Sequence, residues 1–186
     1  LKDSEWSVRR GALAGLARRG AREAGPTIVP LLQDENEQVR LLAADVLKMI
    51  DADECAPEIL VLLTHENEDV RERARDVLTI LDTTPLIPDI VKLLAHDKPD
   101  VRRQALLLLE GIEAKEAAPE ILKLLKDKDA ILGEEAARVL GEWKARDLIP
   151  DIMRLLAHSQ PATRFTAIYA LTLMDVREAI PRIVLS

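Results

Sequence analysis

Three histidines are the side chains whose type and spacing could support metal chemistry. His65 and His96 are 31 residues apart, and His158 follows 62 residues after His96. Equivalent residues of neighbouring repeats lie about one helix-packing distance apart, roughly 8–10 Å, whereas each imidazole nitrogen must approach a zinc ion to about 2 Å. We therefore expect turn residues here, and no metal. The same column also contains the aspartates Asp3, Asp34 and Asp127.

The single cysteine, Cys55, is the candidate for nucleophilic chemistry. Its column predicts a small, buried packing residue, because every equivalent position is apolar. The chain contains neither a Gly-x-Ser-x-Gly motif nor a glycine-rich phosphate loop. The sequence therefore indicates no catalytic residue, no cofactor and no enzyme activity. The residues equivalent to Cys55 are Ala24, Leu86, Ala117, Leu148 and Ala179.

An arginine recurs in the same way and could form a basic ladder for an anionic partner. Each arginine is expected in the first turn of a helix beside acidic turn residues, where a guanidinium can bridge carboxylates and carbonyls of adjacent repeats. We favour this structural role because the net charge of −7 opposes an anion site. The column contains Arg9, Arg40, Arg71, Arg102 and Arg164.

The elements that position these side chains follow from a repeat of 31 residues, and the 186 residues of the chain equal six such periods. An isoleucine follows each repeated proline by two positions, and further columns contain only alanine or only leucine. The prolines are Pro26, Pro57, Pro88, Pro119, Pro150 and Pro181. We assign one repeat domain with units at about 1–25, 26–56, 57–87, 88–118, 119–149 and 150–180, and a partial unit at 181–186.

Each unit predicts two helices. A proline is tolerated in the first turn of a helix, and the apolar residues that follow it have helical spacing. After a polar turn, a longer second helix has one apolar stripe, of which Val70, Ala74, Val77 and Leu78 are an example. A hairpin of this length cannot bury its apolar face alone, so the hairpins must stack. The sequence predicts an all-α solenoid.

Composition narrows the classes of function. With 32% charged residues and a net charge of −7, the chain has no overall basic field for nucleic acid or anionic lipid. No apolar run approaches the roughly 18–20 residues that span a membrane. One cysteine excludes an intramolecular disulfide. We expect a cytoplasmic protein whose partner is neither nucleic acid nor a membrane.

The repeated unit resembles a known family. Its Pro-Glu-Ile-Leu-x-Leu-Leu segment and the later Val-Arg-x-x-Ala-x-x-x-Leu segment are similar to the short bacterial HEAT repeat, the HEAT-like repeat of phycobilin lyases. The Val-Arg pair stands at Val8-Arg9, Val39-Arg40, Val70-Arg71 and Val101-Arg102, whereas Leu132-Gly133 departs from it. The resemblance covers essentially the whole chain. It implies a right-handed α-solenoid, or α-α superhelix, whose second helices line the concave face.

The exposed columns of the second helices vary from repeat to repeat, while the framework columns stay constant. A rigid scaffold that presents a specific surface is expected to vary in this way. We predict a non-enzymatic scaffold that binds another protein or a peptide on the concave face. Phe165 and Tyr169 share one helix face and either anchor the partner or pack against a further repeat. The predicted partner-binding residues are Arg10, Leu41, Asp45, Glu72, Asp76, Arg103, Leu107, Glu134, Arg138, Phe165 and Tyr169.

Two other functions remain open. The resemblance permits a phycobilin-lyase-like module or another enzyme-associated HEAT-like module, although no polar anchor for a tetrapyrrole stands out. Nucleic-acid binding, as in HEAT-like glycosylases, requires a continuous basic groove, which Asp45, Glu72, Asp76 and Glu134 would interrupt. The sequence begins and ends within a unit, so we also expect further repeats or a capping partner at the open ends.

Overall fold

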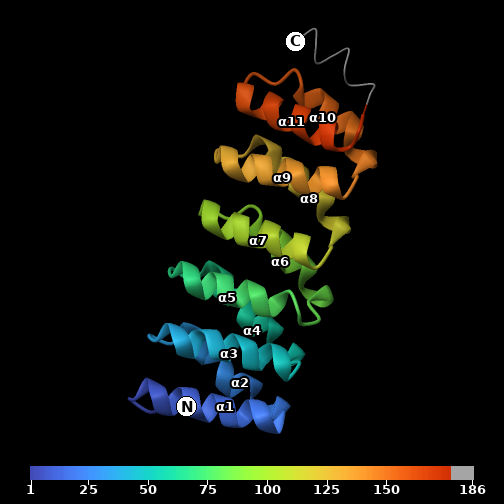
Figure 1. Cartoon of the computed structure of the whole chain (residues 1–186). Helices are drawn as coiled ribbons and strands as arrows, with labels where there is room; N and C mark the ends of the chain where they lie inside the picture. Colours follow the sequence, from blue (N-terminus) through green and yellow to red (C-terminus); the bar gives the residue numbers. More distant parts are fainter. Residues whose placement is uncertain (177–186) are drawn as a thin grey trace. The chain divides into compact units, whose positions relative to one another are not determined.

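The computed structural model describes residues 1–176, and within them every regular element is helical. Residues 177–186, which include Pro181 and the predicted partial unit 181–186, lie outside the described residues. The chain divides into two compact units, Leu1–Ile90 and Val91–Ser186, which we call the N-terminal and C-terminal units. Each stacks consecutive helix pairs, which is the construction of an α-solenoid (Figure 1).

The longer second helices begin 31 residues apart along the whole described chain. Their bounds are α1 Trp6–Arg19, α3 Glu37–Met49, α5 Glu68–Leu78, α7 Pro99–Gly111, α9 Ala130–Glu142 and α11 Pro161–Leu173. Local sequence explains where they start. The side chain of Asn36 accepts a hydrogen bond from the Gln38 amide at 2.9 Å, and Asp129 does the same for the Ile131 amide at 3.0 Å.

The shorter first helices also begin at intervals of 31, one residue before the repeated proline. Their bounds are α2 Gly25–Ile28, α4 Ala56–Val61, α6 Ile87–Leu93, α8 Ala118–Ile121 and α10 Ile149–Leu155. Three of them pass directly into a 3₁₀ segment, namely Val29–Gln33, Leu62–Thr64 and Leu122–Lys126. A separate 3₁₀ turn precedes each short helix, and these turns are Arg22–Ala24, Asp53–Cys55, Thr84–Leu86, Lys115–Ala117 and Arg146–Leu148.

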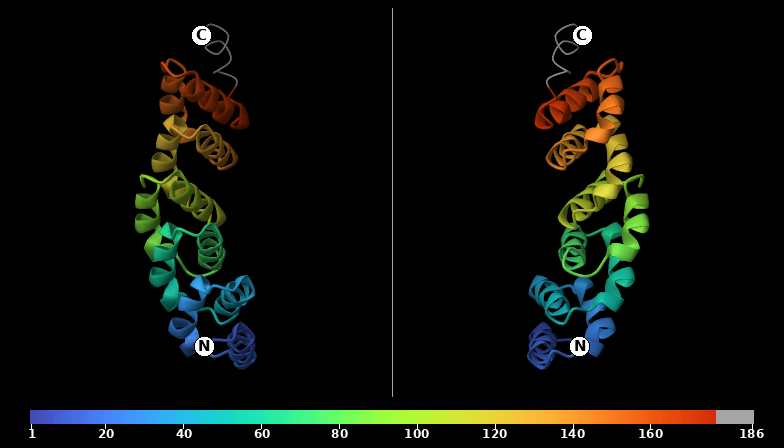
Figure 2. Two further views of the ribbon diagram at one scale, coloured as in Figure 1. Left: turned by 90° about the vertical axis from the view of Figure 1, so that its left-hand side faces the viewer. Right: turned by 90° about the vertical axis from the view of Figure 1, so that its right-hand side faces the viewer.

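Within each unit the second helices form one layer and the short helices form the other (Figure 2). In the N-terminal unit, α3 packs against α1 and α5. In the C-terminal unit, α9 packs against α7 and α11. The predicted framework columns lie between the layers: Ile28, Ile59, Ile121 and Ile152 are completely buried. Burying a side chain of this kind stabilises the folded state by about 1.5–3 kcal/mol.

The first repeat departs from this rule. Ala43, Ala74, Ala136 and Ala167 are fully buried, whereas Ala12 in the same column is exposed. Leu16 is likewise only half-buried, although later members of its column are fully buried. These residues lie on α1, which packs on α3 and has no second helix before it in sequence. Among the described residues, none of the helices combines the length and apolar character needed to cross a bilayer.

Candidate interaction surface on the second helices

The recurring arginines lie at the seams between successive repeats. Arg9 donates from Nη1 to the carbonyls of Asp3 and Ser4, which belong to the turn before its own helix. Its Nε and Nη2 hold the carboxylate of Asp34 in the next repeat, both at 2.7 Å. One guanidinium therefore closes its own turn and ties it to the following repeat, as the sequence predicts.

Arg102 repeats this geometry in the C-terminal unit. It donates to the carbonyls of His96 and Asp97 at 2.8 and 3.0 Å, and to both carboxylate oxygens of Asp127 at 2.8 and 2.7 Å. Arg40 uses a different carboxylate, that of Asp69 at 2.5 Å. The change has a clear cause, because the position equivalent to Asp34 and Asp127 in that repeat is His65.

The histidines act as turn acceptors rather than as a metal cluster. Nδ1 of His65 accepts from the Asn67 amide at 3.0 Å, and Nδ1 of His158 accepts from the Gln160 amide at 3.2 Å. The carboxylate of Asp34 accepts from the Asn36 amide in the same way at 2.9 Å. Histidine and aspartate thus alternate in this column because either can accept a hydrogen bond from the amide two residues later.

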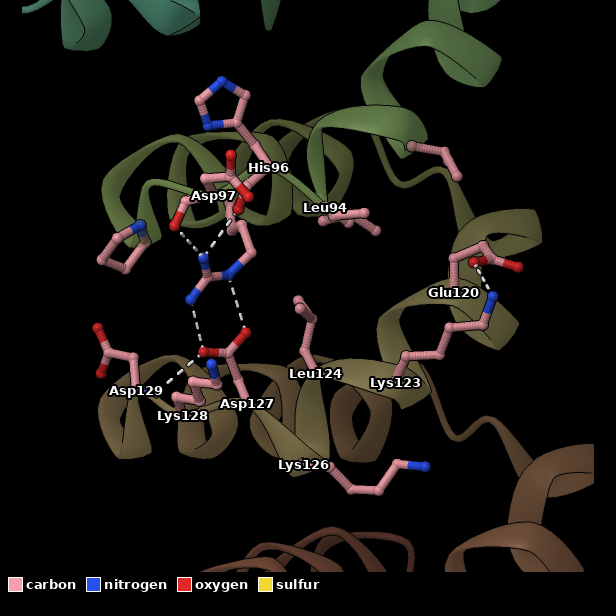
Figure 3. Close-up of a pocket in the computed structure, with 14 residues that line it drawn as sticks. Leu94, His96, Asp97, Glu120, Lys123, Leu124, Lys126, Asp127, Lys128 and Asp129 are labelled. Carbon is pink, nitrogen blue, oxygen red and sulfur yellow. Dashed lines mark hydrogen bonds and ion pairs between the residues drawn. The ribbon is translucent and has the colours of Figure 1, made fainter.

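The largest cavity of the C-terminal unit, about 700 Å³, follows one of these seams. His96 and Asp97 face Asp127 across it in Figure 3, and the guanidinium of Arg102 joins the two sides through its hydrogen bonds. Glu120 and Lys123 at its other end form an ion pair. These groups hold two repeats together, so we assign the cavity a structural role.

Two seam carboxylates have shifted pKa values. Burial raises the pKa of Asp34, but hydrogen bonds from the Arg9 guanidinium and the Asn36 amide outweigh it and hold the pKa below its ordinary value. Burial also raises the pKa of Asp69, and there the guanidinium groups of Arg40 and Arg73 outweigh it. Both carboxylates are therefore ionised at neutral pH.

Cys55 lies in the core of the N-terminal unit. Its side chain is buried and forms no disulfide, as its apolar column predicts. Burial raises the pKa of the Cys55 thiol, and the negative charges of Glu54 and Glu58 raise it further. The thiolate, which is the nucleophilic form, is therefore disfavoured.

The predicted partner-binding residues of the N-terminal unit are all accessible. Arg10 on α1 and Leu41 on α3 are exposed, and Asp45, Glu72 and Asp76 are half-buried. Several of their charges are compensated locally. Asp45 forms an ion pair with Lys48 at 2.9 Å on the same helix. Asp76 contacts Arg73 and Arg75 at 3.2 and 3.0 Å.

In the C-terminal unit the two predicted arginines are bound by neighbouring glutamates. Arg103 on α7 holds Glu135 of α9 at 2.6 Å. Arg138 on α9 holds Glu110 of α7 at 2.6 Å and Glu142 at 3.0 Å. The Glu135 hydrogen bond raises the pKa of Arg103, and the Glu110 hydrogen bond raises the pKa of Arg138. Both arginines are thus committed to holding α7 and α9 together.

The remaining predicted residues form a small surface patch on α9 and α11. Phe165 is 54% exposed, and its ring stacks on that of Tyr169 with centroids 6.4 Å apart and planes 17° apart. Ile131, 67% exposed, and Glu134 line the same open cavity of about 230 Å³ as the two rings. We call Ile131, Glu134, Phe165 and Tyr169 the aromatic patch. Leu107, also predicted, is half-buried on α7.

Sequence reasoning missed Ile131 and the partners of the arginines. One signal was available for Ile131, because its column otherwise contains Gln38, Asp69, Asp100 and Ala162. A large apolar residue at the exposed start of a helix stands out in such a column. No comparable signal identified Glu110 or Glu135, because ion pairing depends on the side-chain directions of two helices rather than on the repeat.

Comparisons with known proteins agree with the helical-repeat fold. The sequence pattern of HEAT repeats matches residues 1–79 and 119–184, and that of the PBS lyase HEAT-like repeat matches residues 101–127. Among curated proteins, no match was found. An engineered protein of known structure is similar, with 19% identity, a TM-score of 0.49, and coverage of 94% of this chain and 93% of that one.

Two further solved structures are similar at lower TM-scores. A designed armadillo repeat protein in complex with the peptide (KR)4 has 19% identity and a TM-score of 0.46, over 87% of this chain and 85% of that one. The complex of CpcE and CpcF of phycocyanin lyase from Nostoc sp. PCC7120 has 21% identity and a TM-score of 0.39, over 99% and 74%. Because the HEAT-repeat pattern matches most of its length, this chain belongs to the HEAT-repeat family.

Proposed function

We propose that this chain is a non-enzymatic scaffold that binds another protein or a peptide, and that the partner contacts the aromatic patch on α9 and α11. The observation that carries the proposal is the exposure of Phe165 and Ile131 on one open surface, at 54% and 67%. Exposed apolar side chains that gather at one place gain free energy when a partner covers them. Aromatic residues are also frequent anchors of protein interfaces.

The support beneath the patch favours a preformed binding surface. Ala136, Ala137, Ala167 and Ala170 are completely buried, on the two helices that carry the patch. Small residues of this kind allow two helices to approach closely. A rigid surface loses little conformational entropy on binding, and this raises its affinity for a partner.

The proposal is non-enzymatic because of how the ionisable groups of this surface are arranged. Arg103 and Arg138 form ion pairs on an open helix surface, and the cavity beside the patch is shallow and small. Enzyme sites typically occupy clefts of about 300–1,000 Å³ in which polar groups converge. Neither the lyase-like nor the nucleic-acid alternative has a comparable observation in its favour.

Site-specific photo-cross-linking tests the proposal. The photoreactive amino acid p-benzoylphenylalanine replaces Phe165 in one sample and Val61 in a control sample. Val61 is 67% exposed but lies on α4, away from the second helices. After irradiation in an extract of the source cells, we expect a discrete adduct from position 165 that position 61 does not give. Identical adducts from both positions, or none from position 165, would refute the proposal.

The identified partner then allows a direct measurement. We expect Phe165→Ala to weaken its binding at least tenfold, because truncation of a central aromatic anchor typically costs more than about 1.4 kcal/mol. Val61→Ala should leave the affinity unchanged. Far-UV circular dichroism of both variants checks that the helices remain intact.

A further inference from the structure

We infer that the segment bound at the aromatic patch is basic and amphipathic, and that it places a lysine or arginine against Glu134 and an apolar side chain against Ile131 and Phe165. This inference rests on the proposed function and specifies the chemistry of the partner. It depends on the charges around the patch, on the geometry of the rings and on the size of the cavity.

Glu134 is the uncompensated charge of the patch. Its side chain is exposed, and within residues 1–176 no hydrogen bond or ion pair engages it. The next residue, Glu135, has the opposite situation, because Arg103 contacts both of its carboxylate oxygens at 2.6–3.0 Å. A cation from a partner can therefore pair with Glu134 without breaking an existing contact.

The wider surface is also acidic. Two arginines, Arg103 and Arg138, are present beside four glutamates, which gives a local charge of 2 − 4 = −2. An acidic partner would have to displace Glu135 or Glu110 from these arginines, whereas a basic partner displaces nothing. The electrostatic field of the surface therefore attracts positive segments and repels negative ones. The four glutamates are Glu110, Glu134, Glu135 and Glu142.

The rings add to the preference for a cation. Phe165 and Tyr169 line the same cavity as Glu134, and their π faces carry negative potential. A lysine or arginine stem can lie along the rings while its charged end reaches the carboxylate. A neighbouring apolar side chain then covers Ile131 and the exposed edge of Phe165.

The size of the cavity argues for side chains of a polypeptide rather than for a whole cofactor. Its volume of about 230 Å³ lies below the range of about 300–1,000 Å³ typical of small-molecule sites. One or two side chains fit such a hollow, while the remainder of the segment extends over the surface of α9 and α11.

Fluorescence anisotropy with three labelled peptides tests the inference on the full chain. The probe is the blocked dodecapeptide (Lys-Leu-Ser)4, and the comparison peptides are (Glu-Leu-Ser)4 and (Lys-Ser-Ser)4. We expect saturable binding of the first peptide, no binding of the acidic peptide, and binding at least tenfold weaker of the peptide without leucine. Raising the salt concentration should weaken the binding, because the Debye length falls from about 10 Å at 0.1 M to about 3 Å at 1 M.

Matched variants connect the binding to the patch. Glu134→Gln should weaken binding of (Lys-Leu-Ser)4 about three- to tenfold, since it removes the charge but keeps the shape of the side chain. Glu116→Gln is the control, because Glu116 is an exposed residue of the same unit on a 3₁₀ turn. Phe165→Ala should weaken binding at least tenfold. Equal affinities of Glu134→Gln and Glu116→Gln, or equal binding of the acidic peptide, would overturn the inference, as would the absence of binding by the basic peptide.

The outcome also separates this inference from the proposed function. If position 165 gives a specific photo-adduct that (Lys-Leu-Ser)4 does not suppress and Glu134→Gln does not reduce, the chain binds a partner at the patch but the partner is not basic. If position 165 gives no specific adduct and the peptides do not bind, both statements are wrong.

Discussion

Individual residues at the repeat seams have more than one task. Arg102 closes its own turn through two carbonyls, and its other edge holds Asp127 of the next repeat. Asp127 in turn accepts a hydrogen bond from the Asp129 amide at 2.9 Å. Both side chains are close to fully buried, with 13% and 9% exposed. The loss of either one leaves polar groups of the other without a partner in a nearly dry place.

We therefore expect Asp127→Ala to lower the free energy of unfolding by about 2–4 kcal/mol, because the Arg102 charge stays buried without its carboxylate. Urea denaturation at neutral pH measures the change. The control is Glu120→Ala, which removes one partner of an exposed ion pair with Lys123 and should cost less than about 1 kcal/mol. Equal effects of the two substitutions would contradict this view of the seam.

The depressed pKa values of Asp34 and Asp69 predict how stability depends on pH. A carboxyl whose pKa is lower in the folded state contributes stability above its ordinary pKa of about 3.9 and loses it as the pH falls through the folded value. We expect the free energy of unfolding to fall below about pH 4. Urea titrations at several pH values measure it. Asp34→Asn should flatten the dependence, and an unchanged dependence would show that Asp34 is not its source.

At the scale of the elements, the ends of the helices follow a backbone rule that the side chains do not always suit. The residue after α1 is Gly20, with φ of 59°. Its equivalents in later repeats include Asp51, Glu113, Lys144 and Asp175, which adopt the same left-handed conformation with φ between 47° and 54°. Glycine is favoured at this position because it has no Cβ. The repeat therefore fixes the turn even where the sequence lacks glycine.

Gly141 has a different role, which is close packing of α9 against α11. A Cβ at this position would lie 2.4 Å from Cβ of Leu173. We expect Gly141→Ala to destabilise the fold by about 1–3 kcal/mol, because the helices must move apart. Gly15→Ala on α1, where a Cβ meets nothing within 4 Å, should instead stabilise by about 0.5–1 kcal/mol through helix propensity. Thermal unfolding of both variants measures these effects, and a stable Gly141→Ala would contradict the packing argument.

The sequence could predict the elements well because their causes recur every 31 residues. The helix pairs, the buried isoleucine, alanine and leucine columns, the buried Cys55 and the arginine seams all follow from periodic positions. The candidate site could be predicted only in part. Phe165 and Tyr169 were identifiable from their spacing, but the pairing of Arg103 with Glu135 depends on how neighbouring helices direct their side chains.

At the scale of the molecule, the packing within each unit runs mainly between successive repeats. The stability of such a protein is approximately a sum of repeat and nearest-neighbour terms. Leu171 is nearly completely buried on α11, so Leu171→Ala should cost about 2–5 kcal/mol locally. We expect faster hydrogen exchange in α9, α10 and α11 and unchanged exchange in α1 and α3, as measured by mass spectrometry. A uniform rise over all helices would instead indicate one cooperative unit.

The seam at Arg102 also bears on how such a chain can change in length. The donor and the acceptor lie 25 residues apart, which is less than one period of 31. An in-frame duplication of residues 97–127 therefore carries both partners, and every copy of Arg102 again meets a copy of Asp127. The gene could lengthen by such a step without burying an unmatched charge. Tandem duplication is thus a mutation that this architecture accepts more readily than many single substitutions.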